Sequence, residues 1–205
     1  MTIIDDARRR DEALGDIDWR ALPEGVRRDT VAAPSGPLAR LVAGPDDAQR
    51  VVLVPGATGS KEDFVLMLPI LTAAGYRVEA YDLAGQYESA AAGPERLTPP
   101  RPRYDHRLFV DDLVAVLEAG RTPAHVLGYS FAGLVAQQAL AERPGLFASL
   151  TLLTTPPASG QVFRGVKRIG RLSDAAGPRT AATLMLWGIR NNLNRVGPQR
   201  LAFVK

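Results

Sequence analysis

Short apolar runs of strand length alternate with segments of helical pattern between residues 25 and 157. The run Arg50-Val-Val-Leu-Val54 is almost wholly apolar, which is typical of a strand covered on both faces. Gly75 and Pro144 mark helix ends, and Asp105 is a good helix N-cap. We therefore expect strands at 25–33, 37–43, 50–54, 76–83, 124–128 and 148–154, and helices at 62–74, 106–118 and 131–142.

The order of these elements indicates the fold class. The first two strands are predicted to be an antiparallel pair joined at Pro34-Ser35-Gly36-Pro37, and the later strands alternate with helices. Such alternation is characteristic of an α/β protein with a mainly parallel sheet and helices on both faces. We expect about six strands, with the last of them, 148–154, buried.

The character of the chain changes after Thr155-Pro-Pro157, where the sequence becomes basic, helical in pattern and poor in strand signals. We expect two regions. Residues 1–157 would form the α/β core, and residues 158–205 would form a basic, lid-like helical layer.

Composition narrows the class of protein. The 205 residues, 46% of them hydrophobic, suffice for one domain with a substantial core. No cysteine occurs, which excludes disulfides, thiolate metal sites and a cysteine nucleophile in this chain. No apolar run approaches the ~20 residues that a membrane helix needs, and no secretory pattern opens the sequence. We expect a soluble, cytoplasmic protein.

The net charge of +3 is distributed unevenly, because residues 160–205 carry nine Lys or Arg against the single acid Asp174. Such a segment could attract nucleic acid or acidic lipid. Its basic residues recur at helical spacing, however, and no aromatic residues interleave them as in a single-strand binder. We interpret them as a solvated helix face and expect no nucleic-acid partner.

The candidate chemistry centres on Ser130. The sequence Gly128-Tyr-Ser-Phe-Ala-Gly133 stands between a predicted buried strand and a predicted helix. A serine on such a sharp turn projects its hydroxyl above the sheet, where the positive end of the following helix also points. This arrangement, called a nucleophile elbow, suits serine-based acyl transfer.

A second glycine-rich turn, Pro55-Gly-Ala-Thr-Gly-Ser60, allows two interpretations. It follows a strand and precedes a helix, and Asp82 closes the next strand, as in a dinucleotide-binding unit. Against a reductase, Glu62 and Asp63 would repel a pyrophosphate, and no tyrosine is followed by a lysine four residues later.

The same turn could instead form one wall of an oxyanion hole, in which two backbone amides face the developing negative charge. Phe131, the residue after the candidate nucleophile, would supply one amide and Ala57 the other. This interpretation accounts for both glycine-bearing turns with one assembly.

Taken in order, these motifs resemble the α/β-hydrolase family. The matching segments are 51–60 (usually His-Gly-x-x-x-Ser, with Pro55 in place of histidine), Asp82-Leu-Ala-Gly85 with Ser89 (usually Asp-x-x-Gly-x-Gly-x-Ser, with Tyr87 in place of a glycine), and 128–133 (usually Gly-x-Ser-x-Gly, with Ala132 in place of the second glycine).

The resemblance implies an eight-stranded sheet, with a lid after the sixth strand and an acid and a histidine after the last two strands. About six strands are expected here, and no histidine follows Ser130, so the chain is interpreted as a truncated, N-terminal portion. The resemblance implies no metal and no organic cofactor. A serine at the elbow also argues against the aspartate nucleophile of the dehalogenase and epoxide-hydrolase branches.

The residues before Ser130 offer little to replace the missing base. His125 precedes Ser130 by five residues on one strand, roughly 16 Å away at the other end of the sheet. His106 is placed in what reads as a solvated first helical turn. Asp82 is expected to organise a loop, and Lys61 to face solvent.

Three classes of function follow: a serine hydrolase acting on a small acyl substrate (an ester, thioester or similar bond), a non-catalytic binding protein of the same fold, and a dinucleotide-binding reductase.

A further expectation concerns the strand at 148–154, which contains no charge and no proline. If it forms the edge of the sheet, it could promote self-association.

Overall fold

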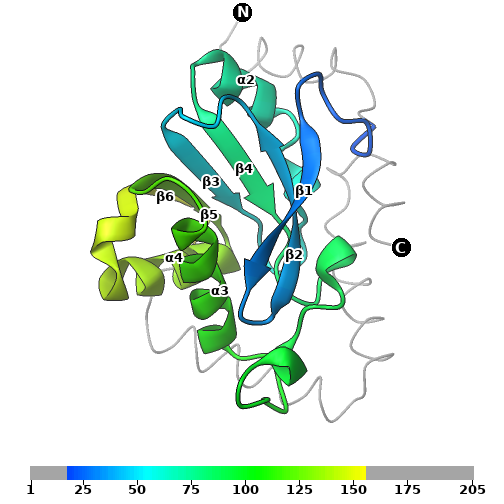
Figure 1. Ribbon diagram of the computed structural model, residues 1–205, viewed down its shortest axis with the longest axis vertical. Helices are drawn as coiled ribbons and strands as arrows, with labels where there is room; N and C mark the ends of the chain where they lie inside the picture. Colours follow the sequence, from blue (N-terminus) through cyan, green and yellow to red (C-terminus); the bar gives the residue numbers. More distant parts are fainter. Residues whose placement is uncertain (1–17, 156–205) are drawn as a thin grey trace, which may run out of the picture. The chain divides into compact units, whose positions relative to one another are not determined.

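A single six-stranded sheet organises the computed structural model, which describes residues 18–155 (Figure 1). The spatial order is β1-β2-β4-β3-β5-β6. The strands are β1 (Arg27–Ala33), β2 (Gly36–Ala43), β3 (Arg50–Val54), β4 (Arg77–Tyr81), β5 (Ala124–Tyr129) and β6 (Phe147–Leu153). The predicted six strands are confirmed, each shifted by no more than a few residues.

Strand directions divide the sheet into two parts. β1, β2 and β4 pair antiparallel, whereas β4, β3, β5 and β6 pair parallel. β3 lies between β4 and β5. After β3 the chain forms β4 on one side of it and later forms β5 on the other side. The carboxyl ends of β3 and β5 therefore meet where the strand order reverses, which is where open α/β sheets bind ligands.

Within residues 18–155, three α-helices accompany the sheet: α2 (Met67–Ala73), α3 (His106–Glu118) and α4 (Phe131–Glu142). The expected helix 62–74 is divided, because a 3₁₀ turn at Lys61–Phe64 precedes α2. Asp105 caps α3 as predicted, accepting a hydrogen bond of 2.8 Å from the N–H of Leu108. No helix within residues 18–155 combines the length and apolar character that crossing a membrane requires.

The core lies on both faces of β3, because alternate side chains of a strand point in opposite directions. Val52 and Val54 belong to a cluster that includes residues of α3 and α4, whereas Val51 and Leu53 pack with Leu68 of α2. Helices on both faces of a mainly parallel sheet are thus confirmed.

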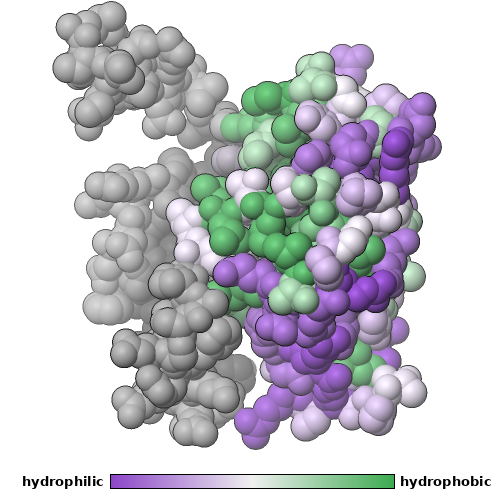
Figure 2. Space-filling model, turned by 90° about the vertical axis from the view of Figure 1, so that its left-hand side faces the viewer, coloured by the Kyte–Doolittle hydropathy of each residue, from purple (hydrophilic) through white to green (hydrophobic). Residues whose placement is uncertain are grey.

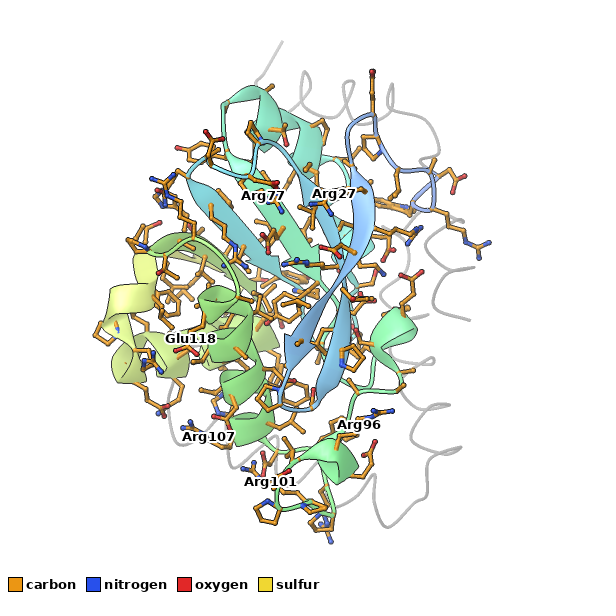
Figure 3. All side chains as sticks on the ribbon, in the orientation of Figure 1. Arg27, Arg77, Arg96, Arg101, Arg107 and Glu118 are labelled. Carbon is orange, nitrogen blue, oxygen red and sulfur yellow. The ribbon has the colours of Figure 1, made fainter. Side chains whose placement is uncertain are left out.

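α3 and α4 pack against each other beside the sheet (Figure 1). Two ion pairs join them. Arg107 of α3 contacts Glu142 of α4 at 2.7 Å, and Glu118 pairs with Arg143, the residue that follows α4; Figure 3 labels Arg107 and Glu118.

Buried charge links the strands from β1 to β3. Glu79 Oε2 accepts from Arg50 Nη2 at 2.7 Å and from Arg40 Nη1 at 2.9 Å, and Arg40 also contacts Asp29 at 2.7 Å. Burial acts to raise the pKa of Glu79, but Arg50, Arg40 and Arg77 outweigh it and hold that pKa below its usual value. This network keeps neighbouring strands in register.

β6 differs from the expectation of a buried strand. Within the described chain it pairs only with β5, and Leu152 and Leu153 remain 46% and 44% exposed. The expectation was wrong because an apolar run does not reveal whether a strand has one neighbour or two. Figure 2 shows one side of the molecule, on which apolar side chains gather among polar ones.

The predicted lid region, residues 158–205, lies outside the described residues.

The turn between β1 and β2 is anchored to α3 by a buried carboxylate. Asp112 accepts hydrogen bonds from the hydroxyl of Ser35 at 2.6 Å and from its N–H at 3.1 Å. Burial raises the pKa of Asp112 to about 6. The folded protein therefore holds the proton of Asp112 up to about pH 6, well above the pH at which a free aspartate loses it.

Asp112 should make stability depend on pH. Between about pH 4 and 6 the carboxyl ionises in the unfolded chain before it ionises in the folded one, so stability falls as pH rises, by up to about 3 kcal/mol. In Asp112→Asn the amide oxygen can accept from the Ser35 N–H and the amide nitrogen can donate to the Ser35 hydroxyl, and the fall should disappear, as urea unfolding at several pH values will show. The control Asp111→Asn, at a surface residue that pairs with Arg107, should retain it. An unchanged slope in Asp112→Asn contradicts the assignment.

Candidate active site

Ser130 occupies the sharp turn between β5 and α4 that the sequence predicted. Its backbone angles, φ 54° and ψ −117°, lie outside the regions that L-residues usually adopt. The turn is held from two directions, because Ser130 N–H donates to the carbonyl of Leu153 in β6 at 2.8 Å and its own carbonyl accepts from Gly133 at 3.1 Å. The side chain is partly exposed at the carboxyl end of β5.

Two glycines let the strand and the helix approach closely around this turn. A Cβ added to Gly128 would lie 2.7 Å from the Cα of Gly133, and one added to Gly133 would collide with the side chain of Thr155. Ala132, where the family pattern has glycine, is fully buried. Gly133 therefore provides the space on the helix side of the elbow.

The second glycine-bearing turn lies directly beside Ser130. Val54 of β3 is paired with Gly128 of β5, so the segments that follow both strands leave the sheet next to each other. A Cβ built on Gly56 would be 3.3 Å from the Cβ of Ser130. A hydrogen bond of 3.0 Å from Gly59 N–H to the Gly56 carbonyl closes the turn.

The two residues predicted to supply oxyanion amides lie in the segments that adjoin Ser130. Ala57 holds the second position of the turn, whose own hydrogen bond does not use the Ala57 N–H. The N–H of Phe131 is the first of α4, and the first amides of a helix have no acceptor within it. The structure therefore brings all three predicted site residues, Ser130, Ala57 and Phe131, to one end of the sheet.

Lys61 does not face solvent, contrary to expectation. It is 1% exposed, and its ammonium contacts Glu88 at 2.8 Å, Asp82 at 2.9 Å and Glu62 at 3.0 Å. Burial acts to lower the pKa of Lys61, but hydrogen bonds to these carboxylates outweigh it and raise that pKa. Lys61 is therefore a charged structural anchor and unsuited to act as a base. A single sequence carries no signal that pairs residues 61 and 82.

Asp82 organises the loop, as predicted. Its Oδ1 accepts from the N–H of Lys61 at 2.8 Å, so the end of β4 is tied to the segment that follows the glycine-bearing turn. Burial of this carboxylate at 0% exposure agrees with a structural role.

The two histidines occupy different surroundings. His125, at the start of β5, contacts the Ser149 hydroxyl at 2.8 Å and lines a hollow of about 240 Å³ with Met67, at the opposite end of the strand from Ser130. His106 is partly buried, not in a solvated turn as expected. Its ring packs edge-on against the ring of Phe131, with 6.1 Å between the ring centroids. Burial lowers the pKa of His106.

No group of three or more His, Asp or Glu side chains within residues 18–155 is arranged to hold a metal ion. The turn at 56–59 is also unsuited to a pyrophosphate, since the carboxylate of Asp63 lies against Gly59.

Comparison with known proteins agrees with this geometry. A model of the Alpha/beta hydrolase family matches residues 51–204. A curated relative, "Putative carbamate hydrolase RutD" of Variovorax paradoxus (strain S110), is 36% identical over 148 residues, which make up 70% of this chain and 52% of the relative. The chain thus spans about half the length of that relative.

Solved structures are similar as well. An epoxide hydrolase from an endophytic Streptomyces matches with a TM-score of 0.58 and 28% identity, covering 72% of this chain and 43% of the other. Epoxide hydrolase A from Mycobacterium thermoresistibile matches with a TM-score of 0.58 and 26% identity, covering 69% and 44%. A hydrolase from Pseudomonas aeruginosa, 24% identical with a TM-score of 0.65, covers 87% and 65% and shows the shared fold.

The close approach at the elbow can be tested by adding one methyl group. Gly128→Ala should destabilise the protein by about 1–3 kcal/mol, because the new Cβ meets backbone atoms of Gly133 that cannot rotate away. Urea unfolding followed by circular dichroism measures the change. Gly145→Ala is the matched control, because a Cβ there meets nothing within 4 Å, and its effect should stay within about 0.5 kcal/mol. Equal effects of the two variants would show that the elbow is not tightly packed.

Proposed function

Because the chain belongs to the alpha/beta hydrolase family, we propose that it is a serine hydrolase that cleaves an ester, thioester or similar acyl bond through an acyl-serine. One observation supports this proposal above the others: Ser130 stands at a strained turn with the backbone of Gly56 beside it. A serine held in this way is exposed to a substrate that approaches the carboxyl end of the sheet.

Each residue has a role in this proposal. The Ser130 hydroxyl attacks the acyl carbon and loses its proton to a base, and the leaving group departs when the tetrahedral intermediate collapses. The amides of Phe131 and Ala57 stabilise the oxyanion, and the positive end of α4 adds to the field at the same place. Water then releases the acyl group and regenerates the hydroxyl.

The base and the acid are proposed to come from outside these 205 residues. No histidine follows Ser130 in the sequence, and His125 lies at the other end of β5. Lys61 is held as a cation by three carboxylates. The oxyanion donors alone leave a residual reactivity of about 10³ to 10⁴ over water in serine proteases that lack a triad member.

The relatives suggest which substrates to test first. The names of two similar structures specify epoxide hydrolysis, and the curated relative is named for carbamate hydrolysis. A carbamate is itself an acyl compound, so it agrees with a serine at the elbow. We therefore place small carbamates beside esters and thioesters as candidate substrates.

The serine assignment can be tested with a fluorophosphonate, which exchanges its fluoride for a serine oxygen. Because the 205-residue chain lacks the proposed base, it should gain one phosphonyl group at Ser130 slowly, at the residual rate that the oxyanion donors support. Peptide mass locates the label, and Ser130→Ala should gain none there. Ser149→Ala, which changes another serine in the sheet, should react like the unchanged protein. A longer product that supplies the base should label faster; if it folds and still gains no label at Ser130, the protein is a non-catalytic binding protein with a hydrolase-like fold. Protection by a dinucleotide, with activity insensitive to Ser130→Ala, would indicate a reductase.

We also propose that a second copy of the chain pairs with β6. Strand β6 presents one unpaired edge within the described residues, it carries no charge, and two of its leucines are exposed. An open, apolar edge of this kind favours strand addition between molecules.

Leu152→Lys should reduce such self-association, because a charge on an edge strand is costly to bury between sheets. Light scattering of the 205-residue chain over a concentration series should show a mass that rises above the monomer, and less rise in this variant. Ile70→Lys, at a residue of α2 that is 69% exposed, is the control for an added charge. A constant monomer mass at all concentrations contradicts the pairing.

A further inference from the structure

The loop that follows β4 holds the turn at 56–59 through two side chains. Gln86 Nε2 donates to the carbonyl of Ala57 at 2.7 Å, and Tyr87 Oη donates to the carbonyl of Thr58 at 3.2 Å. The carbonyl of Gly56 is already engaged by Gly59 within the turn. Three consecutive carbonyls of the turn therefore have donors, two of them from one neighbouring loop.

This matters for the amides because a peptide unit is planar. In a trans peptide the carbonyl and the next N–H point in opposite directions, so a donor that fixes the one also fixes the other. If a peptide unit of the turn rotated, a carbonyl oxygen could face Ser130 where an amide is needed. The N–H of Ala57 shares its peptide unit with the carbonyl of Gly56, which accepts from the Gly59 N–H. The Gly59 N–H in turn shares its unit with the Thr58 carbonyl, to which Tyr87 donates, and Gln86 holds the unit between them through the Ala57 carbonyl. The two side chains therefore oppose rotation of the Ala57 amide through the hydrogen bond that closes the turn.

The loop that carries these donors is itself firmly anchored. Ser89 is buried, and its hydroxyl accepts a hydrogen bond of 2.9 Å from the N–H of Ala39 in β2. Within the loop, Ser89 N–H donates to the Gln86 carbonyl at 2.8 Å and Gly85 N–H donates to the Ser89 carbonyl at 3.0 Å. Gln86 and Tyr87 thus act from a fixed base.

The backbone of Tyr87 supports a specific use of its side chain. Its φ of 44° lies in the left-handed region, which glycine adopts without strain and a tyrosine adopts only at a cost. The family pattern given above has glycine at this position. A tyrosine placed here is therefore costly for the backbone, while its hydroxyl reaches the turn beside Ser130.

We propose that Gln86 and Tyr87 are positioning residues that hold the turn at 56–59 so that its amide faces the acyl oxygen on Ser130. The inference rests on the proposed serine chemistry, but the rigidity of the turn can be measured independently of that chemistry. Neither side chain is assigned a contact with the reacting atoms.

The test uses Tyr87→Phe and Gln86→Met, which remove the donors and keep similar size. Both should slow phosphonylation of Ser130 about tenfold, a part of the 10²- to 10³-fold loss expected when an oxyanion donor is deleted outright. Both should also speed hydrogen exchange of the Gly59 amide severalfold by NMR. Tyr104→Phe is the control, since Tyr104 donates to the carbonyl of Ala92 and not to the turn.

Tyr87→Gly separates positioning from general stability. It relieves the left-handed strain and should keep or raise the melting temperature, while phosphonylation slows as in Tyr87→Phe. A merely structural role would move both quantities in the same direction. If the hydrogen-exchange rate of the Gly59 amide is the same in Tyr87→Phe and Gln86→Met as in the unchanged protein, the inference is overturned. Absence of label at Ser130 even in a longer product that supplies the base overturns the serine assignment instead, and the exchange data still decide whether the turn is held.

Discussion

The parallel pairing of β3 with β5 is the interaction on which the candidate site depends. Val54 lies opposite Gly128, so the turn after one strand and the elbow after the other emerge side by side. The two segments are about 70 residues apart in sequence, and this register brings them together. A shift by one residue would turn alternate side chains to the other face and separate the Gly56 backbone from Ser130.

Buried charge fixes the strands on the other side of β3 and the loops above them. Arg50, Glu79 and Arg40 connect three neighbouring strands, and Lys61 with Asp82 connects the segment after β3 to the end of β4. Breaking a buried pair by removing one partner leaves an uncompensated charge, which is strongly unfavourable. These pairs therefore specify the arrangement of strands and loops more than they add to total stability.

The elbow illustrates how the protein balances strain against packing. Ser130 has an unfavourable backbone conformation, and it persists because the bond to Leu153 and the close contact of Gly128 with Gly133 surround it. The alanine at position 132, which departs from the family pattern, is fully buried, and Gly133 provides the space on the helix side of the turn. The position of the glycine can therefore shift by one residue while the geometry of the serine is retained.

The sequence by itself determined the order and type of the elements, the mainly parallel sheet, and the sharp turn at Ser130, because apolar periodicity and turn residues are local signals. It did not determine that Lys61 is buried among carboxylates, that β6 is exposed, or that Gln86 and Tyr87 reach the turn at 56–59. Those features depend on which distant segments become neighbours. Only the tertiary structure decides this, since burial and hydrogen-bond partners are properties of the packed chain.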